Sequence, residues 1–161
     1  MNVSDRSRTR IKEWLERIES EVGSPTVTQT TFEVAEDSYR RALDQAEEGH
    51  IDVQVVVRDG SGAVLLNEGD SGWGVPRGQP HADEQLTEAT ERIVRDATGV
   101  DCVVTDATSA TISGIRNADD ETAPAVYRLG VVFTAELAEA EAATDEAVRW
   151  DTDPDPVAEL V

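Results

Sequence analysis

Residues 73–100 read WGVPRGQPHADEQLTEATERIVRDATGV, and this stretch decides the fold. Its first half is rich in glycine and proline, which predicts a loop. Its second half predicts a helix from about Asp83 to Thr98, closed by Gly99, because glycine readily adopts the left-handed conformation that ends helices. A strand is expected directly afterwards, over 100–105. The stretch therefore predicts a loop, a helix and a return to a sheet.

One face of the expected helix is apolar. Leu86, Ala89, Ile93 and Ala97 recur at spacings of three and four, which is typical of a helix packed against a sheet. The alternative for this face is a metal site, since side chains at positions 93, 96 and 97 lie within about 100 degrees of one another on a helix. Magnesium requires hard oxygen ligands, and Ile93 has none. We therefore prefer the packing interpretation.

Strands surround this stretch on both sides. Ile51, Val53, Val55 and Val57 alternate with more polar residues, and the turn residues 59–62 follow, which predicts a hairpin. Further strands are expected at 109–117, 125–134 and 147–150, and a helix at 136–143.

Residues 1–49 form an N-terminal extension that we expect to pack on the same domain as residues 50–161. Apolar residues from Ile11 to Val22 recur at helical spacing, and a second helix is expected over 35–48, ending at Gly49. Between them Thr26 to Val34 is rich in Thr and Val, which favours a strand. The alternative is that Thr30-x-x-Glu33 is a capping box that starts the second helix.

The composition predicts one soluble, cytoplasmic domain. The 161 residues are 39% apolar, enough for one core, and Cys102, the only cysteine, leaves no intramolecular disulfide. No stretch approaches the roughly 18 apolar residues of a membrane span. The net charge of -20 repels nucleic-acid backbones and anionic lipid surfaces, so neither is an expected partner.

The charge pattern indicates adaptation to high salt. Lys12 is the only lysine, and acidic residues are spread along the whole chain. Acidic tails are usually local, whereas this pattern resembles the cytoplasmic proteins of extreme halophiles. The alternative is an unusually acidic protein from a low-salt organism.

Six positions of the decisive stretch match a known motif in register and without a gap. These positions are Gly78, Glu84, Arg92, Val94, Gly99 and Val100. They resemble the box of the Nudix (MutT-like) hydrolases, G-x5-E-x7-R-E-U-x-E-E-x-G-U, where U is a bulky aliphatic residue. The resemblance covers about 51–150. It implies a Nudix-type α/β/α sandwich with a mixed β-sheet, here with an N-terminal helical extension, and Mg²⁺- or Mn²⁺-dependent cleavage of nucleoside-diphosphate-linked substrates.

The chain departs from that box where the family carries its chemistry. In the family, the Glu after the Arg and the two later Glu hold divalent metal and polarise water, whereas Ile93, Asp96 and Ala97 occupy those places here. The resemblance implies a weak metal site at most, made by Asp96 and the Gly78 carbonyl, with Asp119, Asp120 and Glu121 as possible further ligands. The alternative, which we prefer, is that Asp96 is a solvated helix acid and that the three loop acids are a solvated turn. It also implies that Glu84 and Arg92 brace the loop against the helix.

Three residues of the loop are candidates for ligand binding. Arg77 can hold an anionic ligand through paired hydrogen bonds, and a surface salt bridge is its alternative role. His81 can donate a hydrogen bond to phosphate or act as a base. Trp73 can stack on a base, although packing is its more usual role.

The resemblance and its departures lead to three hypotheses. The first is a Nudix-like domain with little or no catalysis that binds a nucleotide-type or other phosphorylated small molecule, or a protein partner. The second is an active hydrolase in which Asp96 and acids outside the helix hold Mg²⁺ or Mn²⁺. The third is a homodimer in which the N-terminal helices pair.

We expect the protein to lose structure when salt is removed. A net charge of -20 repels itself more strongly as the Debye length grows from about 3 Å at 1 M salt to about 30 Å at 0.01 M. Circular dichroism melts across a KCl series measure the effect. A melting temperature that is equal in molar and millimolar KCl would contradict the high-salt interpretation.

Overall fold

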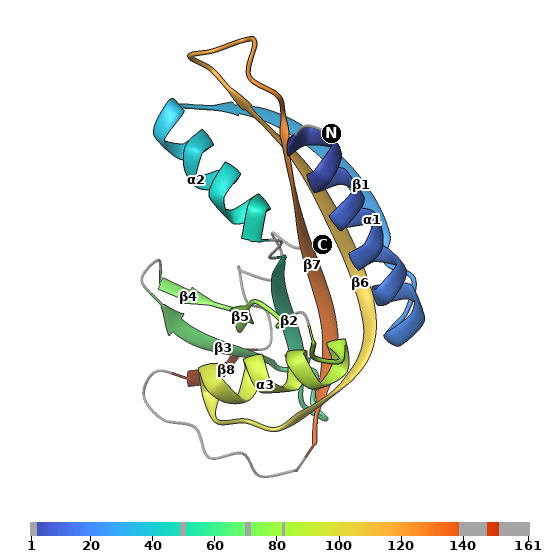
Figure 1. Cartoon of the computed structure of the whole chain (residues 1–161). Coiled ribbons are helices and arrows are strands. Elements are labelled where there is room, and N and C mark those ends of the chain that lie inside the picture. Colours follow the sequence, from blue (N-terminus) through green and yellow to red (C-terminus); the bar gives the residue numbers. More distant parts are fainter. Residues whose placement is uncertain (1–2, 49–50, 70–71, 82, 139–147, 152–161) are drawn as a thin grey trace.

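The computed structural model describes residues 3–48, 51–69, 72–81, 83–138 and 148–151 (Figure 1). Over these residues the chain is an α/β protein, as the sequence predicts. Its strands form one mixed sheet of eight. None of the described helices is long and apolar enough to cross a membrane. The elements follow in the order α1 (Val3–Glu21), β1 (Thr26–Val34), α2 (Glu36–Glu48), β2 (Asp52–Arg58), β3 (Val64–Gly69), β4 (Gly72–Gly74), β5 (Arg77–Gly78), α3 (Leu86–Thr98), β6 (Cys102–Asn117), β7 (Val126–Leu137) and β8 (Val148–Asp151).

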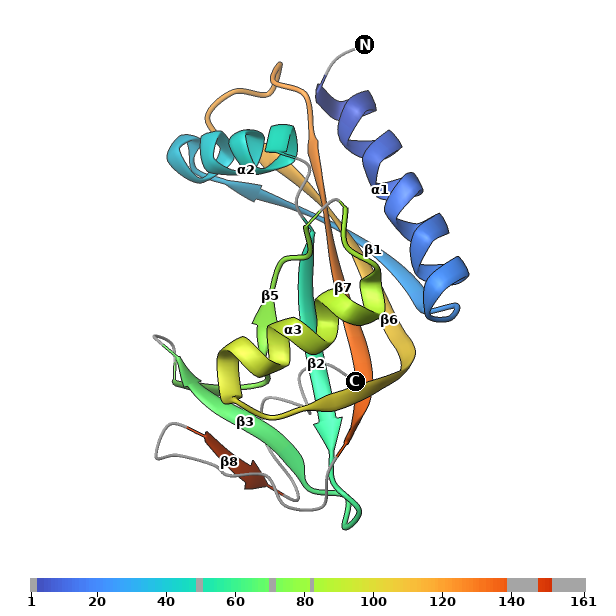
Figure 2. The ribbon, with the colours of Figure 1, turned by 60° about the horizontal axis from the view of Figure 1, so that its bottom comes forward.

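The sheet is ordered β1-β6-β7-β2-β3-β4, with β5 beside β2 and β8 beside β3. The β1–β6 and β2–β7 pairs are parallel, and the other pairs are antiparallel. The β6–β7 pair is the longest and runs through the whole molecule (Figure 2). It joins β1, the strand of the N-terminal extension, to β2, β3 and β4 on the other side of the sheet.

Helices pack on both faces of the sheet. Val53, Val55 and Val57 of β2 point to one face and join the large core beneath α1 and α3. Alternate residues point to the other face, because side chains of a strand alternate in direction. There α2 packs against Val126 of β7 and Ile115 of β6. This is the layered α/β/α arrangement that the sequence predicts.

The extension contributes directly to the large core. Ile18 of α1 is completely buried, and Ile11 and Trp14 lie within the same cluster as the β2 valines. The preferred strand assignment for Thr26 to Val34 is confirmed, since these residues pair with β6 along their full length. The capping-box alternative is wrong.

Two expectations for the segment that leads into α3 are wrong. α3 begins at Leu86 and not at Asp83, because Glu84 N–H donates to the His81 carbonyl (3.1 Å) and closes a turn before the helix. The expected loop before it contains the short strands β4 and β5.

Farther along the chain, the two strands expected between 100 and 117 are one strand, β6, with register shifts at 104/106 and 107/109. Such shifts let one strand bend without ending. Residues 136 and 137 of the expected helix extend β7 instead, and residues 139–147 lie outside the described part.

Truncation of α1 in the core should destabilise the whole domain. Ile18→Ala removes a fully buried side chain, so we expect the free energy of unfolding to fall by about 2–5 kcal/mol. Denaturant unfolding monitored by tryptophan fluorescence and circular dichroism measures it. Glu19→Ala, at an exposed position on the same helix, is the control and should change stability by less than about 0.5 kcal/mol. Two separate transitions, with only the first affected, would show that the extension is an independent unit.

Candidate functional site

The loop before α3 is held by an ion pair between Glu84 and Arg92. The Arg92 guanidinium donates from Nε to Glu84 Oε2 and from Nη2 to Oε1, both at 2.9 Å. Nη2 also donates to the Gln79 carbonyl at 3.0 Å, and His81 N–H donates to Glu84 Oε1 at 2.9 Å. These bonds tie the loop to the second turn of α3, which is the bracing arrangement that the family resemblance implies.

The electrostatics of the pair favour its charged form. Hydrogen bonds from Arg92 lower the pKa of Glu84 from its usual 4.5 to about 2, and the backbone bond from His81 acts in the same direction. A carboxyl group whose pKa is lowered by folding stabilises the fold above its unfolded pKa. The pair therefore stabilises the loop at neutral pH, and this contribution is lost as the pH falls from about 4.5 towards 2.

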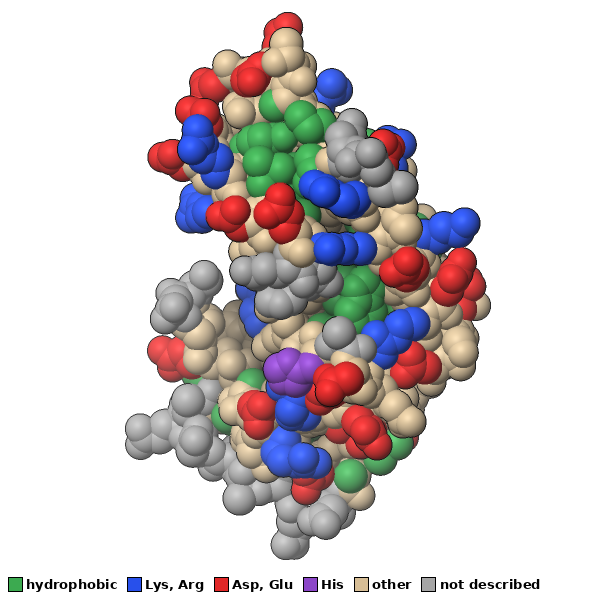
Figure 3. Space-filling view, viewed as in Figure 1, with side chains coloured by type: hydrophobic (Ala, Val, Ile, Leu, Met, Phe, Trp, Pro, Cys, Tyr) green, Lys and Arg blue, Asp and Glu red, His purple; other side chains and the backbone are tan. Residues whose placement is uncertain are grey.

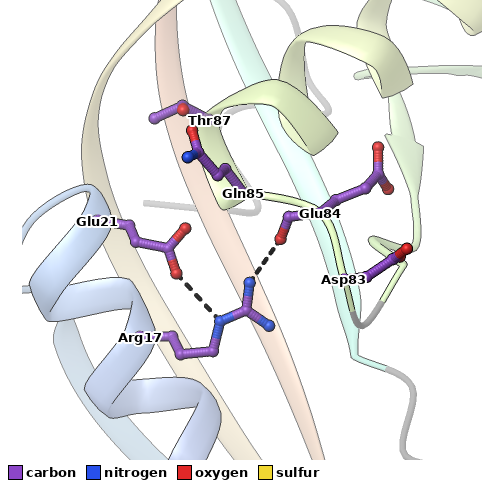
Figure 4. Close-up of a pocket in the computed structure, with 6 residues that line it drawn as sticks. All are labelled: Arg17, Glu21, Asp83, Glu84, Gln85 and Thr87. Atoms are coloured by element: carbon purple, nitrogen blue, oxygen red, sulfur yellow. Dashed lines mark hydrogen bonds and ion pairs between the residues drawn. The ribbon is translucent and has the colours of Figure 1, made fainter.

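The N-terminus of α3 is completed by side chains of α1. The N-cap residue Gln85 makes no side-chain capping hydrogen bond. Instead Glu21 Oε1 accepts from Leu86 N–H at 2.9 Å. Arg17 Nη2 donates to the Glu84 carbonyl at 2.6 Å (Figure 4). Arg17 Nε also pairs with Glu21 at 3.0 Å. Sequence reasoning missed Arg17 and Glu21, because both look like ordinary exposed positions of an amphipathic helix.

These contacts border an open pocket of about 490 Å³ between α1 and the start of α3, lined by Arg17, Glu21, Asp83, Glu84, Gln85 and Thr87. Three of its lining residues are acidic and one is basic. Acidic and basic side chains are interspersed over the surrounding surface (Figure 3). An anionic phosphate is therefore disfavoured in this pocket.

The position of the family's first metal-binding Glu is filled by a buried apolar side chain. Ile93 is only 3% exposed and belongs to the large core. A Cβ added to Gly78 would lie 3.0 Å from Ile93 Cγ1 and 3.2 Å from Cγ2, so the loop and the isoleucine are in close contact. A side chain at 78 would require Ile93 to shift by a few tenths of an ångström. At this contact the loop meets a hydrocarbon side chain of the helix.

The other two positions of the expected metal site do not provide a second buried carboxylate. The Asp96 side chain is 68% exposed and its Oδ2 lies 3.4 Å from Arg92 Nη1. Ala97 is half-buried, so its place in the predicted apolar stripe is wrong; Thr90, Val94 and Thr98 are buried instead. An α-helix has 3.6 residues per turn, so residues spaced four apart gradually move off one face. The buried face therefore shifts towards neighbouring positions along the helix.

The acids at 119–121 lie at α2 and not at α3. Asp119 Oδ2 accepts from Glu36 N–H at 3.1 Å, which caps the start of α2. Asp120 Oδ1 accepts from the backbone and hydroxyl of Thr122 within the same turn. The hydroxyl hydrogen bond from Thr122 lowers the pKa of Asp120. Their recruitment as metal ligands is not supported.

The ligand-binding candidates are dispersed. His81 is exposed, and its ring nitrogen lies 4.0 Å from Glu84. Arg77 is exposed in β5, paired with Gln54 of β2. Trp73 packs against a smaller apolar cluster on the sheet face away from Ile93. The Arg149 guanidinium is stacked 4.5 Å from the centre of its ring. The loop therefore does not gather these three side chains around one point.

Two further observations limit the chemistry of the site. Among the described residues, no group of three or more His, Cys, Asp or Glu side chains is arranged to hold a metal ion. Burial raises the pKa of the Cys102 thiol to about 12, so this cysteine remains protonated and is a poor nucleophile. Over the part of the chain that the structure describes, the residues around Gly78 do not fit the divalent metal that the resemblance implies.

No family model and no curated protein matches the chain. Solved structures similar to it include the MutT protein from Methanosarcina mazei Go1, at 23% identity over 64% of this chain and 76% of that chain (TM-score 0.44). A NUDIX hydrolase from Nitrosomonas europaea shares 16% identity with it, over 69% of this chain and 74% of that chain, with a TM-score of 0.48. An ADP-ribose pyrophosphatase from Streptococcus suis 89-1591 shares 13% identity with it, over 63% of this chain and 72% of that chain, with a TM-score of 0.43. Each TM-score is below 0.5, so the function proposed below depends on the residues of this chain.

Proposed function

We propose that the chain is a Nudix-like binding domain whose box helix is a structural element with little or no catalytic activity. Its ligand is a nucleotide-type or other phosphorylated small molecule, or a protein partner. The observation that carries this proposal is the contact between Ile93 and Gly78. It puts hydrocarbon where the family has a metal-binding carboxylate.

The loss of the carboxylates removes the source of catalysis. A divalent metal in such a site generates the nucleophile and screens phosphate charge, and both effects require oxygen ligands. Asp96 provides one carboxylate, which is exposed and beside Arg92. One carboxylate and a loop carbonyl hold magnesium only weakly, so the metal is not a resident cofactor.

The remaining structure supports binding. The Glu84–Arg92 pair ties the loop to α3, and Arg77 presents an exposed guanidinium directly beside Gly78. Guanidinium groups recognise phosphate and carboxylate through paired hydrogen bonds. We therefore place the anionic part of a ligand at Arg77 and not in the acidic pocket beside α1.

An active Mg²⁺- or Mn²⁺-dependent hydrolase is the second candidate. Its only support is the carboxylate of Asp96, since Asp119 caps α2 and Asp120 accepts from Thr122 within its own turn. This candidate requires a second carboxylate to approach Gly78 from outside the described residues.

A panel of nucleoside diphosphate derivatives distinguishes these candidates. In multimolar KCl with Mg²⁺ or Mn²⁺ we expect turnover far below the roughly 10 s⁻¹ of a typical enzyme, because the metal ligands are missing. Binding, followed by thermal shift, should persist in EDTA and weaken in Arg77→Gln. Arg95→Gln, an exposed arginine on α3, is the control. Metal-dependent turnover near 10 s⁻¹ would refute the non-catalytic proposal.

Restoring the missing carboxylates should create a metal site. Ile93→Glu places a carboxylate against Gly78, and Ala97→Glu adds a second one helical turn later, beside Asp96. The double variant should lose several kcal/mol of stability because an unpaired charge becomes buried. Added Mn²⁺ should restore part of that loss, and should raise the melting temperature of the variant more than that of the wild type.

The matched control for this pair is Ile93→Gln with Ala97→Gln, which has the same shape but no charge. All melts are compared in Mn²⁺ and in EDTA at fixed KCl. An equal Mn²⁺ effect on the Glu and Gln variants would mean that the alignment with the box is wrong, or that this helix face does not meet the loop.

A further inference from the structure

Strand β1 forms an open edge of the sheet. It pairs in parallel with β6 over all nine residues, and no other described strand lies against its outer edge. Its first eight residues are exposed, and only Val34 is half-buried. Val27 is 48% and Phe32 is 44% exposed, and together with Val103 they are the large exposed hydrophobic residues of the described chain.

An edge of this kind is unusual for a parallel pair. Parallel strands generally have both faces covered, and an open edge offers a row of unpaired backbone groups to any other strand. Proteins protect such edges with proline, lysine, bulges or a short strand. β1 has none of these within Thr26–Val34, and its register against β6 is continuous.

The charge distribution indicates what covers this edge. Residues 22–32 are the longest stretch of the chain without a charged residue, although 30% of all residues are charged. Residues 109–115 of β6, beside it, are also uncharged. Two copies with a net charge of -20 each repel one another over most of their surface. β1 is where they can approach without opposing carboxylates.

The sequence of β1 is compatible with pairing to itself. In an antiparallel pair centred on Thr30, Val27 lies opposite Glu33 and Thr28 lies opposite Phe32, so no two acids face each other. Threonine and aromatic side chains are favourable neighbours across strands. A two-fold axis makes such an interface from one surface used twice.

We propose that β1 binds β1 of a second copy of this chain, antiparallel about Thr30, and so joins the two sheets into one. The interface is formed by strands and not by paired N-terminal helices. It does not depend on the ligand or on the chemistry of the α3 site.

A charge swap at Thr30 tests this interface. In multimolar KCl the full chain should sediment as a dimer of the 17.4 kDa protomer. Thr30→Lys and Thr30→Asp each place like charges opposite one another, so each should weaken the dimer by about tenfold or more in Kd. An equimolar mixture of the two variants should restore it. Val103→Lys, an exposed residue of β6 outside the β1 pairing, is the control that should leave the dimer unchanged.

Cross-linking provides a second measurement that tolerates a modest loss of stability. Thr30→Cys should form an intermolecular disulfide under mild oxidation. Thr26→Cys should not, because its two copies would lie about 27 Å apart at 3.4 Å per residue. Circular dichroism melts establish that each variant is folded. A monomeric wild type, a dimer insensitive to both charge variants, or equal cross-linking at 26 and 30 would each overturn the proposal.

Discussion

The start of α3 depends on hydrogen bonds supplied from outside the helix. The first backbone N–H groups of any helix lack partners within it, and a side chain at the N-cap normally supplies one. Here Gln85 does not, and Glu21 of α1 accepts from Leu86 N–H instead. A carboxylate at this end also interacts favourably with the helix dipole. The first turn of α3 therefore lies against the last turn of α1. A residue of α1, outside the stretch 78–100, completes the hydrogen bonding at the start of α3.

Two contacts of different chemistry hold the loop before α3 in the same region. The paired hydrogen bonds between Glu84 and Arg92 hold the loop on one side, and the contact of Gly78 with Ile93 holds it on the other. One contact is ionic and the other is apolar, and neither needs a ligand. The position of the loop is therefore set by contacts that the chain makes with itself.

Much of the fold could be predicted because the responsible signals are local. Apolar spacing located α1 and α2, and Gly99, with φ of 75° and its N–H donating to the Arg95 carbonyl, ends α3 as expected. The errors involve partners far apart in sequence. Glu21 caps α3 and Asp119 caps α2, across 65 and 83 residues, and no local pattern indicates either bond. The site was predictable at Ile93, but the exposure of Ala97 depends on how the helix rests on the sheet.

The absence of carboxylates at 93 and 97 runs against the composition of the chain. Acidic residues outnumber basic residues by 34 to 14, and α3 itself keeps exposed acids at Glu88 and Asp96. If the acidic composition of the chain alone decided the residue at position 93, a glutamate would be expected there. At that position, however, a carboxylate without a cation would be buried against Gly78 in a domain of charge -20, which is costly. Isoleucine avoids this cost and adds roughly 1.5–3 kcal/mol through burial. Without a cation at this position, the stability of the fold favours the apolar residue.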